Sequence, residues 1–194
     1  MSMVNFIRNY RAVMPLVRLI VGVGLVGLFV AVSWAGVAVM IKQTGDEAFC
    51  GSCHTMKPMA AAYRDDVHGG KNTWGIQAEC VDCHLPHNNP ANYLYRKAMT
   101  GMHDVWAEFT YDLDSIDWEA KRGLREHYVY DSGCLHCHTD LEAASEINNK
   151  TFVAHKPYFL GETKEQCASC HKHAGHKNLG EKLASIQASK EEKK

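Results

Sequence analysis

Four copies of the pentad Cys-x-x-Cys-His constrain the fold of this chain more than any other feature of its sequence. They use all eight of its cysteines within 194 residues. In a c-type attachment site the two thiols form thioethers to a haem, and the histidine that follows is placed to ligate the iron. The sequence therefore predicts four covalently bound haem c groups and a role in electron transfer. The attaching cysteines are Cys50 and Cys53, Cys80 and Cys83, Cys134 and Cys137, and Cys167 and Cys170, and the motif histidines are His54, His84, His138 and His171.

Paired cysteines also build zinc ribbons, dithiol redox sites and disulfide frameworks, but each of these uses fits the sequence less well. A zinc ribbon does not need a histidine directly after each second cysteine. A dithiol redox site needs one motif rather than four. A disulfide framework would leave the four trailing histidines without a role. Repetition of the whole pentad favours haem c.

An uncharged stretch near the N-terminus runs for 23 residues, from Leu19 to Ile41. This length is enough to cross a bilayer as one helix. A cleaved secretory signal is the alternative, but its apolar region is usually about 7–15 residues long. No clear A-x-A cleavage site follows the stretch. The sequence therefore favours an uncleaved membrane anchor.

The charges around the span predict its orientation. Arginines and no acidic residues precede it, whereas Asp46 and Glu47 follow soon after Lys42. The positive-inside rule then places the N-terminus in the cytoplasm and the haem domain on the outer face of the membrane. Haem c predicts the same side, because bacteria attach it outside the cytoplasmic membrane. We therefore expect a single-pass protein of the bacterial cytoplasmic membrane with its haem domain in the periplasm.

About 150 residues remain after the anchor to house four haems, so the haems must form much of the core. Such a domain is not expected to fold without its cofactors. We expect a mainly α fold, in which one transmembrane helix precedes a small domain of short helices and loops packed around haems, with helices at 92–110 and 132–148. The predicted divisions are an anchor at 1–42, a tetrahaem domain at 43–180 and a charged tail at 181–194.

The composition also bears on the partners. The formal net charge is −1, and haem propionates add further negative charge, so no nucleic-acid partner is expected. Within the span, Gly27, Ala31 and Ala35 form a stripe of small residues that would let one anchor pack against another in a homo-oligomer.

A haem iron usually takes two axial ligands, so further side chains must complete the sites. His68 precedes the second motif, His155 precedes the fourth, and His176 follows His171 by five residues. Loops at these positions can reach over a neighbouring haem, although each histidine taken singly is as compatible with the surface as with an iron. Met56 offers a soft thioether ligand that would raise the potential of the first haem, or a packing residue.

These residues resemble the NapC/NirT family of membrane-anchored tetrahaem quinol dehydrogenases, including the NrfH-type subunits that feed periplasmic nitrite reductases. The resemblance covers nearly the whole chain. It rests on the anchor and on the segments Phe49–Met56 (FCGSCHTM), Cys83–His87 (CHLPH), Lys97–Asp104 (KAMTGMHD) and Cys170–His176 (CHKHAGH).

The resemblance implies a quinol pocket beside the first haem. In NrfH-like proteins the methionine matching Met56 ligates this haem in place of the motif histidine, so His54 would not be its ligand. The carboxylate matching Asp104 sits on the open side, and Lys97 belongs to the same pocket. A carboxylate within reach of a quinol hydroxyl can accept its proton. Without the resemblance, Lys97 and Asp104, seven residues apart on a helix, would read as a solvated polar face.

The resemblance also implies which histidine completes each of the other sites. It assigns His155 to the second haem, His176 to the third and His68 to the fourth. Some NrfH-like members lack the histidine matching His155 and take a lysine from the partner enzyme. The presence of His155 in this chain implies a second haem whose axial ligands both come from the chain itself.

The electron acceptor is implied less directly. The segments His54–Pro58 (HTMKP) and Asp104–Trp106 (DVW) look nearest to NrfH-like members. This implies that electrons pass from the quinol pool, with menaquinol as the expected donor, to a periplasmic multihaem nitrite reductase. The alternatives are a nitrate reductase, several acceptors, or a tethered cytochrome that relays electrons without a quinol site.

Overall fold

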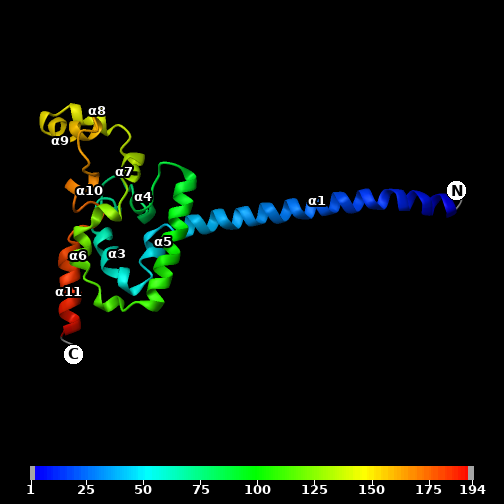
Figure 1. The fold of residues 1–194 in the computed structure, drawn as a ribbon, viewed down its shortest axis with the longest axis horizontal. Coiled ribbons are helices and arrows are strands. Elements are labelled where there is room, and N and C mark those ends of the chain that lie inside the picture. The colour runs from blue at the N-terminus through cyan, green and yellow to red at the C-terminus, as the bar shows by residue number, and fades with distance from the viewer. Residues whose placement is uncertain (1–2, 192–194) are drawn as a thin grey trace. The chain divides into compact units, whose positions relative to one another are not determined.

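The computed structural model describes residues 3–191 of the chain (Figure 1). The described residues form helices and loops without a strand, which confirms the predicted mainly α fold. Residues 192–194, the end of the predicted tail, lie outside the described residues. The helices are α1 (Met3–Gln43), α2 (Glu47–Cys50), η1 (His54–Met56), α3 (Lys57–Arg64), α4 (Cys80–His84), α5 (Pro90–Thr110), η2 (Leu113–Ser115), α6 (Trp118–Gly123), η3 (Arg125–His127), α7 (Asp131–Cys137), α8 (Leu141–Glu146), α9 (Asn149–Phe159), α10 (Cys167–Cys170) and α11 (Leu179–Glu191).

The contacts divide the chain into two compact units, Met1–Thr44 and Gly45–Lys194. The first unit consists of α1. Within α1 the stretch Val13–Gln43 is long and apolar enough to cross a membrane, and no residue of its most apolar window is buried. Among the described residues it is the one helix that meets this test. By length and composition it fits a single-pass anchor.

Four short helices or helix ends carry the attachment motifs in the second unit. Cys50 ends α2, while α4, α7 and α10 each contain both cysteines of their motif. Residues three apart on a helix lie on the same side. One helical turn therefore presents both thiols of a Cys-x-x-Cys pair in one direction. The sequence around each motif needs no more than this turn, which explains why these helices are only 4–7 residues long.

Very little of the second unit is buried by protein alone. The buried hydrophobic side chains among the described residues are Ala60, Ala62, Tyr63, Leu85, Ala168 and Leu179, joined by the fully buried Pro86. Domains of this size normally bury a much larger apolar core. This small core is what the sequence predicts for a domain in which haems occupy the centre.

The helix predicted at 92–110 is present as α5, whereas the helix predicted at 132–148 is wrong. The chain leaves the helical conformation at His138, the residue that caps α7, where ψ is 54°. Two separate helices, α8 and α9, follow and pack on each other. The motif histidine His138 thus ends its cysteine helix, whereas His84 of the second motif is still the last residue of α4.

The C-terminal helix is fastened to the N-terminal part of the same unit. α11 packs on α3 and on α6, and Lys182 donates to Asp65 at 2.6 Å. Lys71 also contacts Asp65, and the two lysines hold the pKa of this carboxyl below its usual range. Partial exposure keeps such pairs weak. Their consequence is mainly positional, because they hold α11 beside α3.

The second and third motifs are held together by a close backbone approach at Gly133. A Cβ added there would lie 1.9 Å from the carbonyl oxygen of Asp82. The backbone N–H of Tyr130 also donates to the carbonyl of Cys83 at 3.0 Å. Only glycine allows α7 to approach α4 this closely.

We expect Gly133→Ala to lower the free energy of unfolding of the holoprotein by about 1–3 kcal/mol, the usual cost of an overpacked site. Unfolding followed by visible circular dichroism of the haems would measure it. Gly123→Ala in α6 is the matched control, because no atom lies within 4 Å of a Cβ built there. Equal stability of the two variants would contradict the close approach.

Candidate haem-binding and quinol sites

The four attachment motifs lie next to one another in the order in which they occur in the chain. The Cys50 thiol contacts the Cys80 thiol, and this contact joins the first motif to the second. α4 packs on α7, which joins the second to the third. The Cys134 thiol contacts the Cys167 thiol and joins the third to the fourth. None of the eight cysteines forms a disulfide. The arrangement gives an unbroken series of four attachment sites.

Three motif histidines each face one of the three candidate distal histidines. The ring centroids are 6.0 Å apart for His84 and His176. They are 6.3 Å apart for the pair of His138 with His68, and 6.1 Å apart for the pair of His171 with His155. Each pair brings together residues that are distant in sequence.

These separations fit an iron atom between the two rings of each pair. Two bonds of about 2 Å, the usual length for an imidazole bound to a transition metal, plus half of each ring give a centroid separation of roughly 6 Å. Imidazoles in ordinary stacking contact lie closer, as His87 and His136 do at 5.0 Å. The donor set of the three pairs therefore fits bis-histidine haem iron.

The observed pairing differs from the one that the resemblance implies. His176 faces the histidine of the second motif rather than the third, and His68 faces that of the third rather than the fourth. His155 faces the histidine of the fourth motif rather than the second. The spacing of histidines along the chain carries no information on which loop covers which haem, so sequence matching paired the same three distal histidines with different motif histidines.

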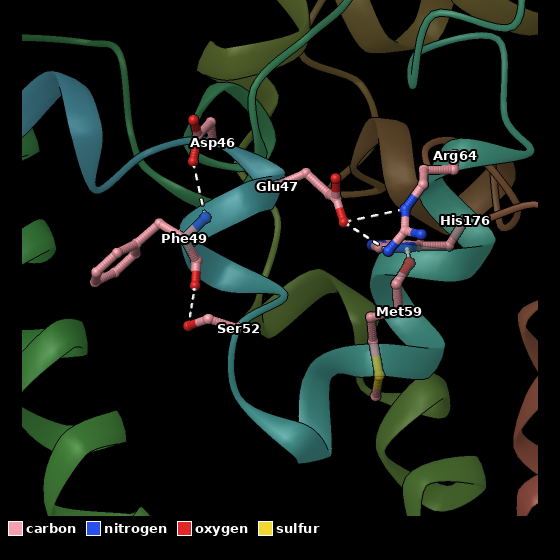
Figure 2. Close-up of polar contacts among 7 residues, drawn as sticks. All are labelled: Asp46, Glu47, Phe49, Ser52, Met59, Arg64 and His176. Carbon is pink, nitrogen blue, oxygen red and sulfur yellow. Dashed lines mark hydrogen bonds and ion pairs between the residues drawn. The ribbon is translucent and has the colours of Figure 1, made fainter.

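Hydrogen bonds orient the distal rings for ligation through Nε2. The Nδ1–H of His176 donates to the carbonyl of Met59 at 3.1 Å (Figure 2). The Nδ1–H of His155 donates to the carbonyl of Thr151 at 2.8 Å. A carbonyl only accepts, so Nδ1 carries the proton and the lone pair of Nε2 remains for a metal.

Figure 2 also shows how the helix before the first motif is held. Asp46 caps α2 by accepting from the backbone N–H of Phe49 at 2.9 Å. Arg64 of α3 donates to Glu47 at 2.9 Å. Because the carbonyl that holds His176 also belongs to α3, the same helix braces both the first motif and a distal ligand. This local scaffold is what the segment between the anchor and Cys50 contributes to the site.

A buried carboxylate that sequence reasoning missed holds the third distal ring. Asp66 is buried and accepts from both the backbone N–H and the Nδ1–H of His68, each at 2.9 Å. The spacing Asp-x-His is the signal that could have found it, because a carboxylate two residues before a ligand can reach its ring. Such a partner fixes the tautomer and raises the basicity of the imidazole.

We expect Asp66→Asn to raise the reduction potential of one haem by roughly 60 mV, the equivalent of a tenfold weaker hold on the oxidised iron. A spectroelectrochemical titration of the holoprotein would resolve this shift from the other three haems. Asp65→Asn is the matched control, because it removes a neighbouring carboxylate that pairs with lysines instead. Equal shifts in both variants would show a general charge effect and contradict the orienting role of Asp66.

The first motif differs from the other three. Among the described residues no histidine ring is paired with that of His54, and the Nδ1 atom of His54 lies 3.1 Å from the Oε1 atom of Glu108 on α5. The side chain of His54 is 63% exposed. Met56 is half-buried at the end of η1, one turn from the second cysteine of the motif. This environment agrees with a first site in which the motif histidine is not an axial ligand.

The structure brings both predicted quinol-site residues to the first motif. Lys97 lowers the pKa of the Cys50 thiol and Asp104 raises it, so both charges lie within electrostatic range of that cysteine. Lys97 is half-buried, and this burial lowers its pKa. Its ammonium lies 5.9 Å from the centroid of the Tyr93 ring. Asp104 is exposed, and its carboxylate lies 3.4 Å from Nδ1 of His103. The helix α5 thus presents a cation and a carboxylate beside one attachment site.

Comparison with known proteins gives one matching family model. It is described as the NapC/NirT cytochrome c family, N-terminal region, and it matches residues 11–181. The match covers the span, all four attachment motifs and the three distal histidines.

Several curated proteins are similar to this chain. It is 34% identical over 170 residues to the cytochrome c-type protein TorY of Escherichia coli O157:H7, which covers 79% of this chain and 45% of TorY. It is 30% identical over 176 residues to the tetraheme c-type cytochrome CymA of Shewanella oneidensis, covering 83% and 89% of the two chains. It is 28% identical over 165 residues to NrfH of Nitratidesulfovibrio vulgaris, a cytochrome c nitrite reductase subunit, covering 84% and 85%. The chain therefore spans less than half of TorY but most of CymA and NrfH.

Proposed function

This chain belongs to the NapC/NirT cytochrome c family, and from that premise we propose that it oxidises a membrane quinol and passes the electrons to a multihaem reductase outside the cytoplasmic membrane. The family and the names of its relatives support a tetrahaem c-type cytochrome that works in electron transfer. We further propose menaquinol as the donor and a cytochrome c nitrite reductase as the acceptor. In this proposal α1 holds the protein in the membrane and the haem domain lies in the periplasm.

The observation that carries the proposal is the position of Lys97 and Asp104 on α5, the helix whose Glu108 contacts His54 of the first motif at 3.1 Å. Oxidation of a quinol to a quinone releases two electrons and two protons. The electrons need a nearby redox centre, and the protons need a base. A carboxylate and a cation next to an attachment site meet both requirements, whereas a relay between soluble proteins needs neither.

The protein groups have distinct tasks in this reaction. Asp104 accepts a proton from a quinol hydroxyl and, being exposed, passes it to water. Lys97 donates a hydrogen bond to the other quinol oxygen or keeps Asp104 ionised, and its half-buried position strengthens this interaction. The haems, when bound, accept the electrons one at a time and carry them along the series of sites.

The ring geometry supports one set of axial ligands. We propose Met56 for the first haem, His84 with His176 for the second, His138 with His68 for the third, and His171 with His155 for the fourth. The three ring separations near 6 Å support the histidine pairs. Thioether ligation raises a haem potential relative to paired histidines, so Met56 would make the first haem the readier acceptor.

The nitrite reductase acceptor rests on similarity to NrfH, which is named as a subunit of that enzyme. CymA covers the chain to a similar extent. The name of CymA, a tetraheme c-type cytochrome, specifies no acceptor, so a different acceptor is the second candidate. Because His155 faces His171, this chain can complete its fourth site from its own residues.

Isolation from the native membrane in mild detergent, followed by addition of a menaquinol analogue, tests the function. We expect rapid reduction of haem c, seen in its visible absorption, and reoxidation when nitrite is added to a preparation that retains the partner. Reduction without reoxidation would keep the quinol reaction and reject the nitrite reductase. No reduction by quinol, with normal reduction by dithionite, would reject the quinol site and leave a tethered relay.

A further inference from the structure

One side of α5 is an exposed apolar surface without protein cover. Its exposed large apolar side chains include Leu94, Met99, Met102, Val105, Trp106 and Phe109, with Tyr95 beside them. Gly101, Met102, Val105, Trp106 and Phe109 line a shallow groove on the helix surface. The most exposed of them, Phe109, keeps 84% of its surface accessible. Soluble proteins rarely leave such a contiguous patch open.

The apolar residues form one continuous arc of the helix. At 3.6 residues per turn, positions 94, 98, 101, 102, 105 and 109 share a face, and 95, 99 and 106 adjoin it. No charged residue falls within this arc. We call these nine residues the outer arc of α5. The arc runs for four turns of the helix, from Leu94 to Phe109.

The opposite side of α5 faces the first attachment motif. Glu108 reaches His54, Lys97 lies beside Cys50, and the Tyr93 ring contacts that of His87. The polarity is therefore inverted with respect to a helix on the surface of a soluble domain, which turns its apolar side inward. Since the first motif lies against the polar side, it does not cover the outer arc.

We propose that the outer arc of α5 lies in the lipid surface, at the boundary between headgroups and acyl chains, as a second membrane contact besides α1. Only six residues separate Gln43, the last residue of α1, from Cys50. Even a fully extended chain spans roughly 25 Å over these seven steps. The first motif, and α5 with it, is thus tethered close to the membrane in which α1 is inserted.

The composition of the arc matches that boundary rather than a protein partner. Tyr95 and Trp106 are the amphipathic aromatic residues that are enriched at membrane interfaces. Arg96 borders the arc next to Tyr95 and provides a cation for lipid phosphates. A helix of this kind lies in the plane of the interface with its apolar side inserted. This placement concerns the lipid contact alone and does not depend on quinol oxidation.

Single introduced cysteines in the holoprotein test the placement, because all eight natural cysteines lie in haem-attachment motifs. The protein carrying Phe109→Cys is placed in nanodiscs, one copy per disc, and treated with a charged, water-soluble maleimide. We expect it to react at least roughly tenfold more slowly than the control, since the apolar side of an interfacial helix inserts about 5–10 Å below the headgroups. Ile147→Cys is the matched control, because Ile147 is an apolar side chain that is 88% exposed outside α5.

A second measurement identifies what covers the arc. Discs made with a phospholipid that carries a diazirine on its acyl chain are irradiated, and we expect lipid adducts on the unsubstituted protein at Met102 and Val105 but none at Ile147. Equal maleimide rates for the two cysteine variants would overturn the proposal. Protection that appears only with two copies per disc, or only after a reductase is added, would also overturn it by showing a protein partner. Normal absorption of the four haems checks that each variant is folded.

Discussion

Replacement of His176 by alanine is expected to leave one of the four haems without its second imidazole, and that haem is expected to be the one attached at Cys80 and Cys83. The ring of His176 lies 6.0 Å from that of His84, the motif histidine of this site. Alanine offers no replacement ligand. The electron paramagnetic resonance spectrum of the oxidised protein should lose one bis-imidazole low-spin signal and gain one high-spin signal.

The identity of the altered haem separates the two pairings. An experimental structure of the His176→Ala holoprotein should show the missing axial ligand over the second attachment site. A missing ligand over the haem of Cys134 and Cys137 would instead support the pairing that the resemblance implies, and contradict the geometry. His173→Ala is the matched control, because His173 is exposed and faces none of the motif histidines in the described part of the chain. It should leave all four signals unchanged.

Substitution of Asp104 by asparagine is expected to slow the reduction of the haems by quinol by roughly 10²–10⁴-fold, the usual contribution of a positioned proton acceptor. Asparagine has nearly the same shape but cannot take up a proton. Reduction by dithionite, which requires no proton acceptor, should remain unchanged. Stopped-flow absorption of the protein in nanodiscs, with a menaquinol analogue as donor, measures both rates.

The control for this prediction is Glu162→Gln, which neutralises an exposed carboxylate in the segment between α9 and α10. The haems of this variant should be reduced by the quinol analogue at the same rate as those of the unsubstituted protein. A rate for Asp104→Asn within a factor of about two of this control would show that Asp104 is not the proton acceptor. Only a failure of the unsubstituted protein to be reduced by the quinol analogue would leave the relay as the function.

The sequence predicted the features that depend on neighbouring residues. The anchor can be recognised from the sequence because bilayer thickness fixes the length of an uncharged run. The attachment sites can be recognised because two thioethers and a ligand need five consecutive residues. The mainly α fold follows from how few residues remain per haem. All of these are short-range requirements, so one stretch of chain is enough to reveal each of them.

The remaining features depend on contacts between distant segments. His176 lies 117 residues from Met59, whose carbonyl orients it, and no local pattern encodes that pairing. The spacing of Asp66 and His68 is a local signal of an orienting carboxylate, but the site that it serves is known only because His68 faces His138. The break at His138 was missed because the helix at 132–148 was predicted as continuous. No local pattern marked the end of α7 at this residue. Sequence reasoning thus predicted the candidate distal histidines without their partners.

The contact of His176 with the second site also orders the assembly of the protein. The distal histidines of the third and fourth sites, His68 and His155, precede the motif histidines that they face. These two sites can therefore form as soon as their motifs are present. The second site must wait, since its distal ring follows its motif histidine, His84, by 92 residues. Closing a loop of that length has an entropic cost that local contacts do not offset until the rest of the domain has formed. The segment around His176 thus closes the domain, and the second site is completed after the third and the fourth.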